Sequence, residues 1–308
     1  MKVFRHLRSL GRRFPNPVLT LGNFDGVHRG HQEILARTVA LAKELAGTAL
    51  ALTFEPHPAA VLMPTHAPKR LMDLHTRLAT LLATGVDHVV LQRFTPEFAA
   101  IEPEPFVRDW LVGALGVRAI VVGHRVRFGH FRRGDAMLLE TLGRELGLRV
   151  EIVGKVEVGG RLVSSSAIRS LIHEGNLEWA AQMLGRPHTF AGRVIHGHHR
   201  GQALGFPTAN LGLDNICLPP DGVYVVQAWV RDRWWPGVAN LGTNPTFGDT
   251  TRQFEVHLLD FSETLYGRRL TVRLLQKLRE EMRFPSVSAL REQIQRDVER
   301  ARQLLQES

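Results

Sequence analysis

Residues 19–31 read LTLGNFDGVHRGH, a short apolar run followed by a turn with glycines and by two histidines. The run at 18–21 predicts a strand. Residues 31–45 predict a helix, because their apolar side chains recur at steps of three and four. The apolar face of this helix would carry Ile34, Leu35, Thr38, Leu41, Ala42 and Leu45. A strand that turns directly into a helix favours an α/β fold with a parallel sheet.

The same alternation continues to about Val156. Strand-like runs occur at residues 49–54, 88–91, 118–122 and 149–153, with longer amphipathic segments between them. A parallel sheet with helices on both faces binds ligands beyond the carboxyl ends of its strands. We therefore expect the residues just after Leu21, Phe54 and Val122 to face a ligand.

The apolar pattern changes its period to two after Gly185. Strands are expected at residues 190–195, 222–230, 234–240, 253–259 and 270–275. Short strands without helices between them predict a small antiparallel barrel or a sandwich. A helix over 177–184 ends at Gly185, and another at 286–305 closes the chain. The sequence thus predicts two domains, 1–185 and 186–308, in agreement with a length of 308 residues at roughly 150 residues per domain.

Composition and charge restrict the function. The chain is 44% hydrophobic and 22% charged, typical of a folded soluble protein, and its net charge of +9 favours anionic partners. The arginines are scattered, so a nucleic-acid-binding protein is the weaker hypothesis and no nucleic-acid partner is expected. No run resembles a membrane span or a signal peptide, so no membrane partner is expected. The single cysteine, Cys217, suits a reducing cytoplasm.

His28 and His31 form the first group with predicted chemistry. Three residues apart, they share one face at a helix N-terminus, where free N–H groups and the helix dipole favour phosphate. Donors placed there can stabilise charge that develops on a triphosphate. Gly22 and Gly26 would let the backbone approach a nucleotide closely. The alternatives are two surface histidines that cap a helix, or a zinc site.

Four blocks in order resemble a known module. They are GNFDGVHRGH (22–31), TFEPHP (53–58), GHRVRFGHFRRGD (123–135) and VSSSAIR (163–169). Together they resemble the adenylyltransferase module of the bacterial bifunctional riboflavin kinase/FAD synthetases, in which a nucleotidyltransferase-type parallel sheet transfers AMP from ATP to FMN and releases pyrophosphate.

The resemblance implies site residues at matching positions. The expected ATP-binding residues, with His28 and His31 also catalytic, are Gly22, Phe24, Asp25, Gly26, His28, His31, Ser164 and Arg169. The expected flavin-binding residues are Pro56, His57, Pro58 and Phe128. Taken alone, Ser164 to Ser166 could simply cap a helix, and TFEPHP could be an ordinary loop.

Arg125 and Val126 depart from the family pattern. The family usually has an acidic or amide side chain followed by an aromatic one at these two places. A guanidinium there changes the local charge. An alternative is therefore a riboflavin kinase whose adenylyltransferase activity is weak or altered.

Residues 192–211, GRVIHGHHRGQALGFPTANL, hold the second group. In an extended segment Thr208 and Asn210 point the same way and offer the hard oxygen atoms that Mg²⁺ prefers. Mg²⁺ commonly neutralises phosphate charge in phosphoryl transfer. PTAN could also be a plain turn. The histidines at 196, 198 and 199 fit a phosphate-facing loop better than a metal site.

The rest of the second half extends the resemblance. The blocks LPPDGVYVV (218–226), GVANLGTNPTF (237–247), FEVHLLDF (254–261) and YGRRLTVRLLQKLREEMRF (266–284) resemble the riboflavin kinase module, an antiparallel β-barrel with a terminal helix. The likeness implies that Thr208 and Asn210 bind Mg-ATP, that Gly192 and Gly205 contact ATP, and that Glu255 is the base. Glu255 could otherwise be a solvated strand residue.

The whole resemblance implies a bifunctional enzyme. Residues 1–185 would adenylylate FMN to FAD, and residues 186–308 would phosphorylate riboflavin to FMN. The substrates would be riboflavin, FMN and ATP, with Mg²⁺ as the cofactor. A rival hypothesis, a nucleotidyltransferase that acts on another phosphorylated substrate, keeps His28 and His31 but leaves the second half unexplained. The sequence makes no prediction of the oligomeric state.

Overall fold

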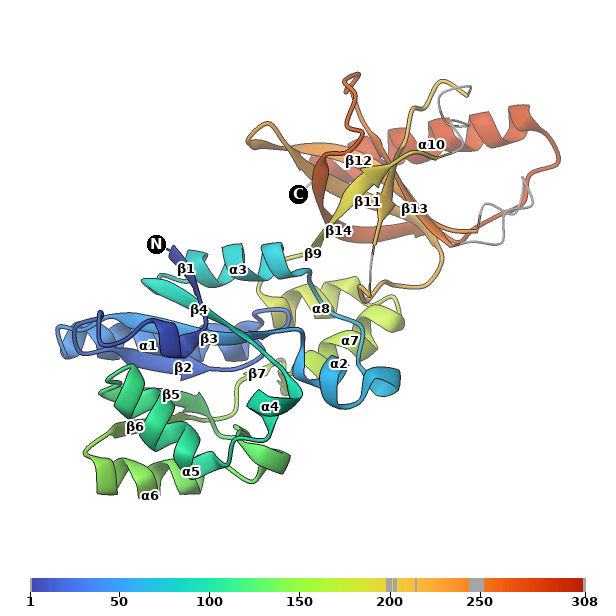
Figure 1. Cartoon of the computed structure of the whole chain (residues 1–308). Helices are drawn as coiled ribbons and strands as arrows, with labels where there is room; N and C mark the ends of the chain where they lie inside the picture. Colours follow the sequence, from blue (N-terminus) through green and yellow to red (C-terminus); the bar gives the residue numbers. More distant parts are fainter. Residues whose placement is uncertain (1, 198–200, 202–203, 214, 244–251, 307–308) are drawn as a thin grey trace. The chain divides into compact units, whose positions relative to one another are not determined.

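The computed structural model describes residues 2–197, 201, 204–213, 215–243 and 252–306. The chain forms two compact units (Figure 1). The first unit comprises the chain up to Pro68 together with Arg77–Ser165, and the second comprises Lys69–Thr76 together with the chain from Ser166 onward. Among the described residues, we find no helix with the length and apolar character needed to cross a membrane.

The first unit is built on one six-stranded parallel sheet. Its strand order is β1-β4-β3-β2-β5-β6. The strands are β1 (Lys2–Arg5), β2 (Val18–Leu21), β3 (Ala49–Glu55), β4 (His88–Arg93), β5 (Ala119–Gly123) and β6 (Arg149–Val153). A two-stranded hairpin follows, formed by β7 (Glu157–Val158) and β8 (Arg161–Leu162). The prediction of a parallel sheet is confirmed.

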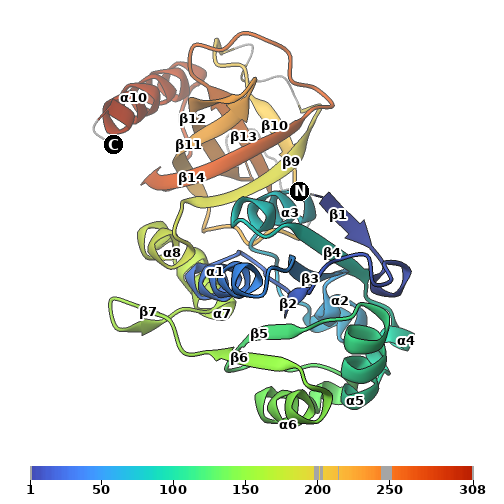
Figure 2. The same ribbon diagram turned by 90° about the vertical axis from the view of Figure 1, so that its left-hand side faces the viewer.

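Helices cover both faces of this sheet, with α1 on one face and α5 and α6 on the other (Figure 2). The α-helices are α1 (Arg29–Glu44), α2 (Pro58–Leu62), α3 (Leu74–Ala83), α4 (Pro96–Ala99), α5 (Pro103–Pro105) and α6 (Ala136–Leu146). Four further helical segments are η1 (Leu7–Ser9), η2 (Pro64–His66), η3 (Phe106–Ala114) and η4 (His130–Arg132).

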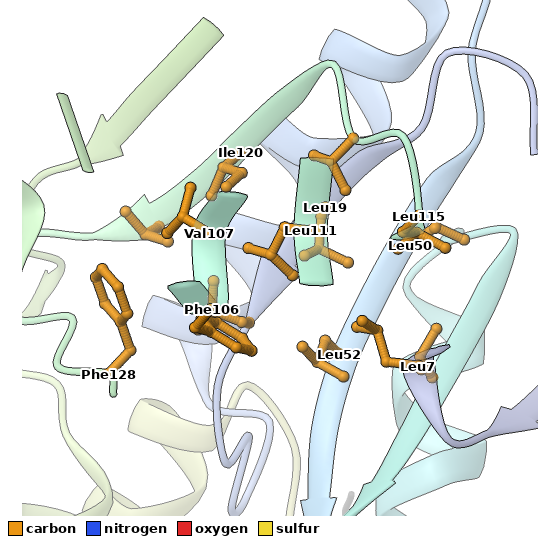
Figure 3. Close-up of a cluster of buried hydrophobic side chains, with 14 of the residues drawn as sticks. Leu7, Leu19, Leu50, Leu52, Phe106, Val107, Leu111, Leu115, Ile120 and Phe128 are labelled. Atoms are coloured by element: carbon orange, nitrogen blue, oxygen red, sulfur yellow. The ribbon is translucent and has the colours of Figure 1, made fainter. Parts of the chain in front are cut away.

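The core of the first unit lies between the sheet and η3. Alternate residues of the strands, such as Leu19, Leu52 and Ile120, pack against Phe106 and Leu111 (Figure 3). These side chains are at most 4% exposed. Because successive strand residues point to opposite faces, the residues between them face α1 instead. The sheet is thus buried on both faces, which explains why its strands read as continuous apolar runs.

Strand β1 was not predicted. It has only four residues and pairs in parallel with β4 at the edge of the sheet. Phe4 packs edge-on against Phe14 and His88. A strand this short, with two basic residues, shows no detectable period in the sequence, so only the contact with β4 reveals it.

The second unit contains a closed antiparallel barrel with strand order β10-β13-β12-β11-β14-β9. Its strands are β9 (His188–Ile195), β10 (Ala209–Gly212), β11 (Gly222–Val230), β12 (Arg233–Gly242), β13 (Gln253–Leu258) and β14 (Arg269–Arg279). The unit also holds helices α7 (Ser165–His173), α8 (Leu177–Leu184) and α10 (Val287–Gln306). Of the two architectures that the period-two pattern allowed, the barrel is correct. Helix α8 packs on β9 and β14, and this places it in the second unit although it precedes residue 186.

The terminal helix α10 is held on the barrel by apolar contacts and by one buried ion pair. Ala301 packs against Val223 and Val238. Asp297 is 5% exposed and accepts hydrogen bonds from Nε and Nη2 of Arg279 on β14, at distances of 2.8–3.0 Å. A buried carboxylate needs such a partner, so this pair fixes where the helix lies along the barrel.

Residues 69–76 form a segment of the second unit although they come from the first half of the chain. Their backbone joins the second unit through Arg70, whose N–H donates to Asn215 and whose carbonyl accepts from Cys217. Leu71 and Met72 are buried. The chain therefore passes between the two units three times, at residues 68/69, 76/77 and 165/166.

His188 makes the stability of the second unit sensitive to acid. Its ring is 1% exposed, and Nε2 lies 2.9 Å from the carbonyl oxygen of Cys217. Burial lowers the pKa of His188 to about 4 from 6.5, because imidazolium is poorly solvated there. Between about pH 6.5 and pH 4, His188 is protonated in the unfolded chain but stays neutral in the folded chain. Stability is therefore full above about pH 6.5 and falls as the pH approaches about 4.

We predict that His188 accounts for a loss of about 3 kcal/mol of unfolding free energy between about pH 7 and about pH 4.5. His188→Gln should flatten this part of the pH dependence, because glutamine can donate to Cys217 without titrating. The measurement is urea unfolding followed by tryptophan fluorescence at both pH values. His66→Gln, at an exposed histidine, is the control and should keep the wild-type slope. An unchanged slope in His188→Gln contradicts the assignment.

Candidate active sites

The first candidate site lies where β2 and β3 end. The turn that follows β2 starts at Gly22, whose N–H donates to the carbonyl of Leu52 on β3. The side chain of Thr53 donates to the carbonyl of Asn23 in that turn. The two strand ends are thus fixed side by side, at the sheet edge where a ligand was expected.

A buried arginine joins these two strand ends. Arg77, on α3, is 2% exposed and donates to the carbonyls of Asn23 (3.2 Å) and Phe54 (2.9 Å). Its Nη2 also forms an ion pair of 2.8 Å with Glu55. One guanidinium therefore donates hydrogen bonds to both loops, which is possible because it carries five N–H donors in a rigid plane. Arg77 was not predicted as a site residue, because its only signal in the sequence is a lone base on the apolar face of a short helix.

His28 and His31 lie together at the start of α1. His28 is the N-cap residue, and its Nδ1 accepts the N–H of His31 at 3.3 Å. The rings are stacked, with centroids 3.6 Å apart and an angle of 14° between the planes. Since Nδ1 of His28 accepts a hydrogen bond, a neutral ring carries its proton on Nε2. The expectation that the two imidazoles lie together at a helix N-terminus agrees with this geometry.

The turn before the histidines has an unusual backbone. Phe24 (φ 49°) and Gly26 (φ 85°) both lie in the left-handed region, and Phe24 is 1% exposed. Its ring packs edge-on against His31. Asp25 is buried, and its carbonyl accepts a hydrogen bond of 2.9 Å from the hydroxyl of Ser165. Strained backbone of this kind is typical of functional loops.

The TFEPHP block lies beside this turn. His57 Nε2 is 3.3 Å from the amide nitrogen of Asn23, and His57 Nδ1 accepts the N–H of Ala59 and caps α2. Pro56 and Pro58 flank His57; Pro56 is exposed and Pro58 is partly exposed. The block is therefore more than a connecting loop, although its role in flavin binding stays a prediction.

Five further residues named in the sequence analysis have different surroundings. Phe128 is 7% exposed, and its ring packs against Phe106 in the core (Figure 3). Arg125 is exposed, whereas Val126 packs against the core. Arg169 belongs to the second unit and donates from Nε to the carbonyl of Lys69. Ser164 immediately precedes α7. The roles expected for these residues stay predictions.

The second candidate site is a row of polar residues across three barrel strands. Glu255 on β13 lies directly opposite Asn210 on β10 and opposite Asn240 on β12. Residues paired in this way share one face of the sheet. The alternate residues of β13, Phe254 and Val256, are buried in the barrel, so the row lies on the other face. Asn240 was quoted in a motif but not predicted as a site residue, because only strand register places it beside Glu255.

Glycines lie directly against the two predicted magnesium ligands. A Cβ on Gly197 would lie 2.2 Å from the amide nitrogen of Asn210, and one on Gly201 would lie 3.1 Å from the hydroxyl oxygen of Thr208. These close approaches require glycine. Neither glycine was predicted as a site residue.

The predicted glycines have structural reasons of their own. Gly205 has φ of 88°, which favours glycine. A Cβ on Gly192 would lie 2.6 Å from the carbonyl oxygen of Gly212 on β10, so β9 and β10 cross closely here. These observations leave the expected ATP contacts untested.

The donor atoms of this site suit a hard cation. Thr208, Asn210 and Glu255 offer hydroxyl, amide and carboxylate oxygens, the ligand types that Mg²⁺ prefers. Among the described residues, no group of three or more His, Cys, Asp or Glu side chains could hold a metal. His196 stacks on Tyr266 with centroids 4.2 Å apart. His198 and His199 lie outside the described residues.

Comparisons with known proteins identify both halves. The family model described as FAD synthetase matches residues 12–167, and that described as riboflavin kinase matches residues 184–305. The chain is 43% identical over 305 residues to the bifunctional riboflavin kinase/FMN adenylyltransferase of Pseudomonas fluorescens, covering 99% of this chain and 98% of the relative. It is 40% identical over 305 residues to the protein of the same description from Escherichia coli K12, covering 98% and 97%.

A solved structure is similar over nearly the whole length. It is described as a macrolide-efflux protein from Streptococcus pneumoniae, with a TM-score of 0.85 and 31% sequence identity. The match covers 97% of this chain and 98% of that one.

The two family models together show that the chain is an enzyme with two transferase domains. The chain belongs to the family of bifunctional riboflavin kinase/FMN adenylyltransferases. It phosphorylates riboflavin to FMN and adenylylates FMN to FAD, with ATP as the co-substrate of both reactions. Family membership covers both activities, and nothing observed favours the alternative based on Arg125 and Val126.

Arg77 provides a test of the first site. Arg77→Lys keeps the positive charge but cannot serve both carbonyls and Glu55, so the two loops should lose their fixed geometry. We predict that kcat/KM for FMN adenylylation falls about ten- to a hundredfold, while riboflavin phosphorylation is unchanged.

The matched control is His75→Gln, at an exposed position on the same helix, which should leave both reactions unchanged. Chromatographic separation of the flavins measures the two rates in one assay. Wild-type adenylylation by Arg77→Lys contradicts the role assigned to Arg77.

Proposed function

We propose that the end of β2 and the start of α1 bind the triphosphate of ATP for adenylylation. The stacked pair His28 and His31 carries this proposal, because it lies at a helix N-terminus whose dipole favours phosphate. His28 Nε2, which holds the proton of the neutral ring, would donate to the phosphates as charge develops on them. Gly22, Phe24, Asp25 and Gly26 would shape the nucleotide pocket. Ser164 would add a further donor to the triphosphate, and the role expected for Arg169 stays a prediction.

The flavin would bind at the neighbouring strand ends. Pro56, His57 and Pro58 lie beside the nucleotide turn through the contact between Asn23 and His57, which supports a flavin position next to the α-phosphate. Phe128, which packs in the core, would complete the flavin-binding residues. FMN would then attack the α-phosphate with its own phosphate oxygen, and pyrophosphate would leave.

For the kinase reaction we propose that Thr208 and Asn210 hold Mg-ATP and that Glu255 is the base. The register that places Glu255 opposite Asn210 supports this arrangement, since a base must lie near the bound phosphates. Mg²⁺, when bound, neutralises charge on the transferred phosphoryl group. Glu255 would orient the ribityl hydroxyl and accept its proton. Because Gly192 and Gly205 have no side chains, the backbone at these positions would lie close to the bound ATP.

We further propose the assignment of activities along the chain. Residues 1–185 would carry adenylylation and residues 186–308 phosphorylation, and the matched ranges of the two family models support this division. The proposed location is the cytoplasm, supported by the single cysteine, Cys217, which suits a reducing compartment. The proposed partners are the small molecules riboflavin, FMN and ATP, without nucleic acid or membrane.

A pair of variants tests the two sites against each other. Glu255→Gln removes the proposed base but keeps the side-chain shape, so riboflavin phosphorylation should fall by about a hundredfold or more while FMN adenylylation persists. His28→Ala should have the opposite effect. Purified protein is incubated with riboflavin or FMN, ATP and Mg²⁺, and the flavins are separated by chromatography.

The matched control for Glu255→Gln is Gln253→Ala on the same face of β13, which should leave both rates unchanged. His66→Gln, an exposed histidine of the same unit, serves for His28→Ala. If either active-site variant slows both reactions equally, the assignment of two separate sites is wrong.

A further inference from the structure

Asp73 binds two neighbouring strands of the kinase barrel from the segment 69–76. Its Oδ2 accepts the backbone N–H of Ala191 on β9 at 2.8 Å. Its Oδ1 forms an ion pair with Nη2 of Arg269, the first residue of β14. The Asp73 side chain is 15% exposed and that of Arg269 is 43% exposed, so the bond to Ala191 is better shielded from water than the ion pair. All of these residues belong to the second unit.

The Ala191 N–H lies beyond the end of the neighbouring strand. β10 pairs with β9 at Arg193, Val194 and Ile195, and this pairing stops two residues short of Ala191. Ala191 is 5% exposed, and a buried backbone N–H needs an acceptor. The carboxylate of Asp73 supplies that acceptor and thereby fixes the part of β9 that β10 does not reach.

This part of β9 is in close contact with β10. Gly192, the next residue, approaches the carbonyl of Gly212 so closely that a Cβ would lie 2.6 Å from it. A displacement of β9 at Ala191 and Gly192 must therefore move β10. β10 carries Asn210 and directly follows Thr208.

We propose that Asp73 is a positioning residue for the riboflavin kinase reaction, acting on Mg-ATP through β9 and β10. The proposal rests on the roles proposed above for Thr208 and Asn210. According to this proposal, a residue in the first half of the sequence helps to position the kinase site, although it lies 118 residues before its partner Ala191.

Asp73 has a second function that the test must keep intact. It caps α3, because Oδ1 accepts the N–H of Thr76 at 2.9 Å and Oδ2 accepts its hydroxyl at 2.6 Å. Asparagine is also a good N-cap residue, but it has one acceptor oxygen and no charge. Asp73→Asn therefore keeps the cap through Oδ1, loses the acceptor for the Ala191 N–H, and weakens the contact with Arg269 because the negative charge is removed. Arg77, one helical turn later, serves the adenylyltransferase site, so the adenylylation rate reports whether α3 is preserved.

The test compares Asp73→Asn with wild type in the full-length enzyme. At saturating riboflavin, KM for Mg-ATP in phosphorylation should rise about three- to tenfold, as expected for the loss of one or two hydrogen bonds. KM for ATP in FMN adenylylation should not change. Asp260→Asn is the matched control, because it breaks an exposed ion pair with Arg302 in the same unit and should leave both KM values at wild type.

Other outcomes overturn the proposal. A lower melting temperature with both KM values unchanged would mean that Asp73 has only a structural role, and a rise in both values would mean a general defect. If Asp73→Asn does not fold, Arg269→Gln must raise the same kinase KM, and an unchanged value overturns the proposal. Asn210→Ala separates the two levels: if it leaves the kinase KM for ATP at wild type, the proposed ligands are wrong whatever Asp73 does.

Discussion

One buried guanidinium determines the geometry of the adenylyltransferase site. Parallel strands end with backbone carbonyls that have no partner in the sheet, and burying such groups unpaired is costly. Arg77 satisfies the carbonyls at the ends of two strands and is itself neutralised by Glu55. The turn that leads to His28 can adopt its left-handed backbone because these bonds hold it. The position of the histidine pair therefore depends on a residue of another helix.

The kinase barrel reaches a comparable precision by different means. Strand register brings Asn210, Glu255 and Asn240 into one row, and the absence of side chains at Gly197 and Gly201 lets the backbone at these two positions lie against the proposed magnesium ligands. A closed barrel has no edge strand that could slip, so its register is well specified. In the first unit a long buried side chain, Arg77, thus sets the positions of the reactive groups, whereas in the second unit strand register and glycine backbone set them.

The sequence was sufficient for the parts of the fold with a clear period. β2, β11 and α8 were predicted to the residue, because each has continuous or alternating apolar positions between clear boundaries. β1 and β10 have four residues, as β2 does, but they are not continuously apolar: β1 carries two basic residues and β10 reads ANLG, so neither is recognisable as a strand in the sequence. The contiguous motifs located the histidine pair, Thr208 and Asn210. Arg77, Asn240 and Asp73 could not be found, because each acts through register or through a partner distant in the sequence. Phe128 was expected to bind flavin and packs in the core, and its role in flavin binding stays a prediction.

The closed barrel also has a consequence for biosynthesis. β9 must wait for β14, which is translated after all the other strands, before the ring of hydrogen bonds can close. Residues 69–76 also contact β9, so this segment is synthesised well before the strand to which it binds. Contacts between such distant positions slow folding. The order of the strands along the chain therefore lets the α/β sheet form on the nascent chain before the barrel can close.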